Sequence, residues 1–96
     1  MAKSILQTEK RCYICGSKMW LENHHIFFGN PNRKLSEKHG LKVWLCHSHH
    51  NEPPYGVHFN AGLRKRLQAK AQKIAMKHYG WTIEDFIRIF GKNYID

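Results

Sequence analysis

Asn23-His24-His25-Ile26 is the stretch around which the rest of the chain is organised. Two further short stretches, Cys46-His47-Ser48-His49-His50-Asn51 and Gly56-Val57-His58-Phe59-Asn60, contain most of the remaining histidines. Together the three stretches hold six of the eight histidines in the chain. Because imidazole is the commonest metal ligand among side chains, this clustering predicts a metal-binding protein.

Two pairs of candidate ligands repeat one spacing. Cys12 and Cys15 form the first pair, and Cys46 and His49 form the second. Two intervening residues let both donors of a pair point at one ion, and Gly16 suits the turn that follows. The repeat predicts a structural Zn²⁺ held by three thiolates and one imidazole. The alternatives are a redox pair, which needs a βαβ setting that is not visible here, and a buried core thiol at Cys46.

The chain has 96 residues and a formal net charge of +9, from 16 lysines and arginines against 7 acidic residues. This length predicts one domain, 1–96, whose small core would gain from a structural metal. The charge predicts a polyanionic partner, either nucleic acid or an anionic membrane surface, with a merely soluble basic protein as the alternative. Three cysteines cannot all form disulfides, and we find no signal-peptide pattern and no apolar run that could span a membrane. We therefore expect a cytosolic protein without a membrane partner.

The apolar pattern predicts an α+β fold that begins with two strands. Residues 18–28 and 41–46 are rich in aromatic and aliphatic side chains and are bounded by glycines, which is typical of strands. The basic, turn-rich loop between them favours an antiparallel return. Within this loop we expect a helical turn at 35–39, with Ser36 as a candidate cap.

Helices are expected to follow the two strands. A short helix that begins after the second strand has to end at Pro53-Pro54. Apolar residues at helical intervals then predict a long helix that begins at Asn60, its candidate cap, and ends at Gly80. Thr82, with Asp85 three residues later, resembles a capping box and predicts a last helix.

Four histidines are left when the zinc ligands are set aside. Because side chains alternate along a strand, His24 and His25 should point to opposite faces and need not share a task. His50 and His58 lie near the start of the predicted helices and could meet the first strand in a pocket. Hydrolysis of a phosphodiester there would require a divalent ion, a base such as imidazole, and cationic groups that hold the backbone.

Basic side chains are the candidate contacts to a phosphate backbone. Two lie in the loop between the strands and four along one face of the long helix: Arg33, Lys34, Arg66, Lys70, Lys73 and Lys77. Each could neutralise a phosphate and displace counterions. The alternative is an ordinary solvated surface. No pattern indicates readout of base sequence.

The combination of Cys12-x-x-Cys15, Asn23-His24-His25-Ile26 and Leu45-Cys46-x-x-His49-His50 resembles the HNH endonuclease family, especially the short HNH proteins of phages and prophages. The resemblance covers a motif core at 12–60, and 61–96 would be a helical extension. It implies a zinc-stapled ββα-metal (His-Me finger) core and a nuclease that cuts DNA with one divalent ion, Mg²⁺, Mn²⁺ or another. By resemblance His24 is a ligand of that ion, His25 is the general base, and His50 is the last ligand.

The chain departs from this family's pattern at two places. An asparagine that helps to fix the base is missing, because no asparagine lies between Arg33 and His50. Another group, such as a backbone carbonyl, would have to take its task. In addition, Pro53-Pro54 shortens the helix that should carry the last ligand, so His58 or Asn60 could bind the ion with His50 or in its place.

The resemblance also suggests where the protein acts. We expect DNA as its partner, the cytosol of a bacterial host as its location, and phage packaging or recombination proteins as further partners. The main alternative is a zinc-stabilised DNA-binding module without catalysis. Such a module would bind one metal ion, whereas the enzyme needs a second, exchangeable one.

Overall fold

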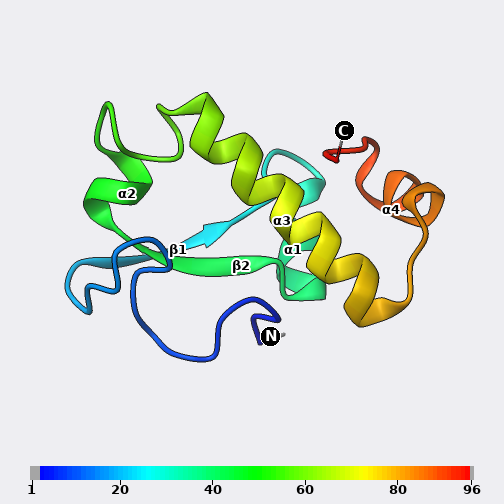
Figure 1. Ribbon diagram of the computed structural model, residues 1–96, viewed down its shortest axis with the longest axis horizontal. Helices are drawn as coiled ribbons and strands as arrows, with labels where there is room; N and C mark the ends of the chain where they lie inside the picture. The colour runs from blue at the N-terminus through cyan, green and yellow to red at the C-terminus, as the bar shows by residue number, and fades with distance from the viewer. Residues whose placement is uncertain (1–2, 96) are drawn as a thin grey trace.

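Figure 1 shows the computed structural model, which describes residues 3–95. These residues form an α+β fold with one two-stranded sheet and four helices, which confirms the predicted class. In chain order the elements are β1 (Leu21–His25), α1 (Asn32–His39), β2 (Lys42–Cys46), α2 (His47–Asn51), α3 (Ala61–Tyr79) and α4 (Ile83–Phe90).

The two strands pair antiparallel, as expected, from Leu21 opposite Cys46 to His25 opposite Lys42. β1 is shorter than the predicted 18–28. Its start is limited by Trp20, whose φ of 55° is left-handed and interrupts the extended backbone. The register places the end of β2 beside the start of β1, and α2 begins directly after it.

The helix between the strands is longer than the predicted turn, and Ser36 is not its cap. Ser36 is buried inside α1, where its hydroxyl donates to the carbonyl of Phe27 at 2.7 Å and accepts from the amide of Phe27 at 3.1 Å. The side chain therefore ties α1 to the chain that leaves β1. Gly40 ends α1 in the left-handed conformation that the return to β2 requires.

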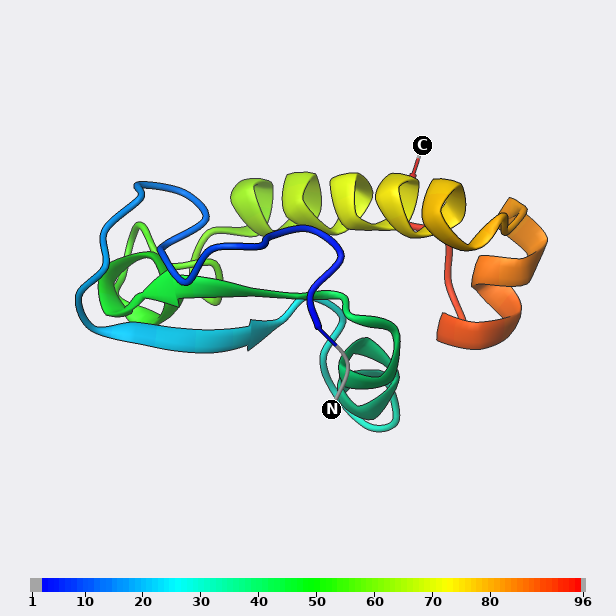
Figure 2. The same ribbon diagram turned by 90° about the horizontal axis from the view of Figure 1, so that it is seen from below.

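The capping predictions for the last two helices are confirmed. The Asn60 side chain accepts from the amide of Leu63 at the start of α3, and Gly80 ends that helix. Thr82 and Asp85 form a complete capping box at the start of α4. Figure 2 shows α3 running along one side of the hairpin, with α4 beyond its far end. Among residues 3–95, no helix has both the length and the apolar composition needed to cross a membrane.

The core lies between the hairpin, α3 and α4. Phe27, which follows β1, packs its ring 5.3 Å from that of Phe86 and 5.0 Å from that of Phe90, both in α4. Leu67, Ala71 and other small or aliphatic side chains of α3 complete this cluster. The helices after the hairpin thus share one core with it.

The N-terminal arm, residues 3–20, forms neither helix nor strand but packs along β2. The amide of Ile5 donates to the carbonyl of Gly40 at 2.9 Å, and the amide of Tyr13 donates to the carbonyl of Trp44 at 2.8 Å. The arm therefore reaches the end of β2 with Cys12 beside it, which brings the first cysteine pair to the second.

Candidate metal centres

The first candidate centre lies where the arm meets the end of β2. Cys12, Cys15, Cys46 and His49 place one ligand atom each within 4.8 Å of one another, so they could hold a metal ion. The Cys15 and Cys46 sulfurs are 3.8 Å apart, and the Cys46 sulfur is 3.2 Å from His49 Nδ1. Two sulfurs bound at about 2.3 Å to one tetrahedral ion lie about 3.8 Å apart. The cluster therefore has the dimensions of a tetrahedral site.

The backbone around Cys12 favours its thiolate. Burial raises the pKa of Cys12, but hydrogen bonds from the backbone of Cys15, Cys46 and Ile14 outweigh burial and lower the pKa to about 6. Because the thiolate is the form that binds metals, Cys12 is prepared as a ligand near neutral pH.

A second cluster contains three histidines from three separate segments. His24 comes from β1, His50 from α2, and His58 from the loop before α3, and their ligand atoms also lie within 4.8 Å of one another. The Nε2 atoms of His50 and His58 are 3.1 Å apart. Small ring rotations would let all three nitrogens face one ion. We call this group the three-histidine cluster.

His24 is the buried member of this cluster, with only 3% of its surface exposed. Burial, followed by the positive charge that His50 and His58 can carry, lowers the pKa of His24 to about 3. The ring is therefore neutral at physiological pH, and a neutral imidazole is the form that binds a metal ion.

This depressed pKa predicts a pH dependence of stability. Below pH 6.5 the unfolded chain takes up a proton at His24 that the folded chain does not, so the free energy of unfolding falls with pH. The loss is about 1.4 kcal/mol per pH unit between pH 6.5 and pH 3. We expect His24→Gln to remove this component when denaturant unfolding is compared at pH 7 and pH 5.5 in zinc-containing buffer. An unchanged pH dependence in the variant would contradict it.

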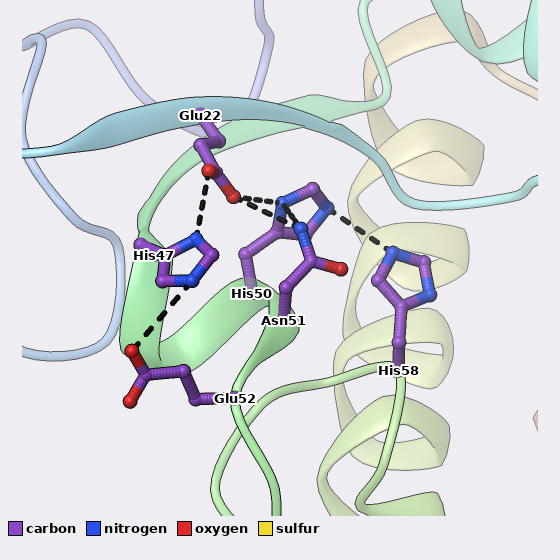
Figure 3. A network of polar contacts seen from close by, with 6 residues as sticks. All are labelled: Glu22, His47, His50, Asn51, Glu52 and His58. Atoms are coloured by element: carbon purple, nitrogen blue, oxygen red, sulfur yellow. Dashed lines mark hydrogen bonds and ion pairs between the residues drawn. The ribbon is translucent and has the colours of Figure 1, made fainter.

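Glu22 organises the face of β1 on which the cluster lies, as Figure 3 shows. One carboxylate oxygen accepts from His50 Nδ1 at 2.7 Å, and the other accepts from His47 Nδ1 at 2.9 Å. These hydrogen bonds, with a third from Asn51, lower the pKa of Glu22 to about 2. Because His50 donates through Nδ1, its Nε2 is left as a ligand atom directed at His58. A carboxylate behind a ligating imidazole commonly orients the ring and raises its basicity.

The sequence analysis missed Glu22. The signal was present, because Glu22 precedes His24 by two residues and therefore shares its strand face. However, which helix would cover that face was not evident from the sequence. The contact with α2 exists only because the hairpin folds that helix back over β1.

His25 points to the other face of β1, as its place after His24 predicts. Its Nε2 lies 2.9 Å from Glu37 Oε1 in α1, and Lys42 Nζ lies 2.6 Å from the second oxygen of the same carboxylate. The hydrogen bond from Lys42, and then that from His25, lowers the pKa of Glu37. His25 is not brought together with the three-histidine cluster. Its partner is a carboxylate, where we expected a backbone carbonyl.

Asn60 was one of the candidates for the last ligand, but the structure gives its side chain another task. Its Oδ1 accepts from the amide of Leu63 at 2.9 Å as the cap of α3. His50 and His58 both belong to the three-histidine cluster, so neither replaces the other.

The predicted phosphate contacts separate into three groups. Arg66 and Lys73 line a groove between α3 and the C-terminal segment 92–95. Lys70 instead places its ammonium 4.8 Å from the centre of the Tyr13 ring in the N-terminal arm, and Lys77 is exposed outside the groove. The third group, Arg33 and Lys34, is exposed in the first turn of α1. Three more basic residues line the groove, Arg64, Lys65 and Lys92, which the sequence analysis did not select.

Comparisons of the chain with protein-family models, with curated proteins and with solved structures found no match. The resemblance to HNH endonucleases therefore depends on the motif residues alone.

Proposed function

We propose that the protein is a metal-dependent endonuclease that hydrolyses phosphodiester bonds in DNA. The observation that carries the proposal is the three-histidine cluster, a candidate metal site that lies beside a basic groove. Phe28 joins the two, because it lines the groove and its ring centre lies 5.4 Å from that of His58. A cation site next to a positive surface suits the negatively charged phosphodiester.

The two clusters suit different tasks. Three sulfur ligands and one imidazole, with no further position open, are typical of a structural Zn²⁺. Three imidazoles leave positions free for water and substrate, as in catalytic sites. Because imidazole suits transition metals, and Mg²⁺ prefers oxygen ligands, the cluster favours a transition-metal ion. A divalent ion there would neutralise charge on the scissile phosphate and its leaving oxygen.

His25 is the proposed general base. If its Nε2–H donates to Glu37, the other ring nitrogen, Nδ1, is free to take a proton from the attacking water. Lys42 keeps the Glu37 carboxylate ionised, so Glu37 takes the positioning task of the asparagine that the chain lacks. Because His24 and His25 leave β1 on opposite sides, the proposal requires the phosphate to lie at the end of the strand, within reach of both.

A nicking assay tests the proposed function. Wild-type protein should convert supercoiled plasmid to the nicked form with Mn²⁺, Ni²⁺ or Co²⁺, and more slowly with Mg²⁺. His58→Ala should lose this activity because one of three ligands is removed. His47→Ala is the matched control, since His47 also contacts Glu22 but lies outside the three-histidine cluster.

The outcomes of this assay are distinct. Equal activity in the two variants would contradict the assignment of the site. DNA binding without nicking in any of these ions would instead support the alternative, a zinc-stabilised DNA-binding module.

A further inference from the structure

We propose that the groove between α3 and residues 92–95 binds a short length of single-stranded DNA, and that Phe28 stacks on one of its bases. The proposal deepens the proposed function, because it names the form of the substrate and the path of the strand. It rests on the shape, the charge and the rigidity of the groove, and on its continuity with the three-histidine cluster.

The groove is strongly and uniformly positive. It is lined by five basic side chains from α3 and the C-terminal segment, Arg64, Lys65, Arg66, Lys73 and Lys92. None of the described residues that line it is acidic. Unbalanced positive charge of this density along one channel attracts a chain of phosphates, whereas a small neutral ligand gains nothing from it.

The size of the groove favours one strand over a duplex. Its volume is about 760 Å³, within the range of clefts that enclose a ligand of small-molecule size. A double helix presents a far larger convex surface and could meet only the rim. A few nucleotides of one strand can lie inside, with their phosphates against the basic walls.

The second wall of the groove is held in place by a buried side chain. Gln72 of α3 is fully buried, and its amide donates to Asn93 Oδ1 at 2.8 Å while its carbonyl oxygen accepts from the amide of Tyr94 at 2.7 Å. Tyr94 in turn packs its ring 4.7 Å from that of Phe27 in the core. Figure 1 shows the C-terminal segment returning beside α3. The groove is therefore preformed, which lowers the entropy cost of binding.

The groove continues to the proposed metal site. Arg64, which lines it, donates to the carbonyl of Val57 at 3.1 Å and so joins α3 to the loop that carries His58. Phe28 lies at this junction with 41% of its surface exposed. An exposed aromatic ring beside a basic channel is the usual platform for an unpaired base. A strand that stacks on Phe28 would pass the three-histidine cluster.

Charge reversal on α3 tests the path. All four variant sites are exposed lysines of this helix. Lys65→Glu/Lys73→Glu changes the groove, and Lys70→Glu/Lys77→Glu makes the same change of charge outside it. Binding of fluorescent 12-nucleotide oligo-dT is measured by anisotropy without added divalent ion, after thermal denaturation confirms that each variant is folded. We expect at least tenfold weaker binding for the groove pair and less than threefold for the control pair.

The salt dependence and the base stacking provide independent readouts. Loss of two phosphate contacts should reduce the slope of log affinity against log salt by about 1.4 for single-stranded DNA. Phe28→Ala should weaken binding of oligo-dT about tenfold, whereas Phe59→Ala, which truncates another exposed ring, should not. A 12-base-pair duplex and a 12-residue polyglutamate peptide should bind more weakly than oligo-dT.

Three results would overturn the path: equal losses in the two charge-reversed pairs, tighter binding of the duplex, or binding of polyglutamate as tight as that of oligo-dT. These outcomes are separate from the nicking assay. A protein that nicks plasmid but shows equal losses retains the proposed function and loses the groove. A protein that binds oligo-dT through the groove but never nicks retains the groove alone.

Discussion

Removal of the ion from the cluster of Cys12, Cys15, Cys46 and His49 is expected to unfold the chain. Structural Zn²⁺ sites contribute about 10–16 kcal/mol of apparent binding free energy, which exceeds the total stability of most small domains. Here the ion would join the N-terminal arm to the start of α2. Without it, the cysteine side chains would lose the ligand that gathers them and the arm would lose its anchor at the end of β2.

The measurement is circular dichroism during thermal unfolding, with and without a strong chelator, together with elemental analysis of the bound metal. Cys46→Ala should behave like the chelated protein and lose one equivalent of zinc. His47→Ala, which changes the next residue on α2 but no ligand, should retain both the metal and the melting temperature. A chelated protein that keeps its melting temperature would show that the cluster does not hold the fold together.

Substitution of the proposed base should have the second large effect. His25→Ala is expected to slow single-turnover cleavage of DNA by about 10²- to 10⁴-fold, the usual contribution of a positioned general base. Binding of the DNA and of the metal should be retained, because His25 contributes to neither the groove nor the three-histidine cluster. The rate is measured at saturating ion concentration across pH 5.5–8.5, where loss of the base should also flatten the pH profile.

Glu37 provides a finer test of the same arrangement. In Glu37→Gln the amide oxygen can still accept from His25 Nε2, but the negative charge that favours a protonated His25 is lost. We expect a smaller loss of rate than in His25→Ala and an altered pH profile. His78→Ala, which removes an exposed imidazole outside both clusters, is the control. Wild-type rates in His25→Ala would mean that another group takes the proton.

Features encoded by local spacing could be predicted from the chain alone. The two ligand pairs with two intervening residues indicated which four side chains would meet, and the structure brings them together. The caps at Asn60 and Thr82 were also predictable, because a cap involves residues only three positions apart. Strand alternation likewise placed His24 and His25 on opposite faces before any partner was known.

The partners across each face were not predictable, because they depend on which helix covers which side of the hairpin. Glu22 contacts His50 only where α2 folds back over β1, and Glu37 contacts His25 only where α1 packs against the other face. Likewise, Gln72 lies on an otherwise apolar face of α3 and makes sense only beside the returning Asn93.

The basic residues of α3 show the same limit at the level of a surface. Their spacing indicated one charged face, yet Lys73 lines the groove while Lys70 rests on the Tyr13 ring. Helical periodicity determines the angle at which a side chain leaves the helix. Whether that side chain meets the N-terminal arm, the C-terminal segment or water depends on where chain segments far apart in sequence come to lie, and this requires the packed molecule.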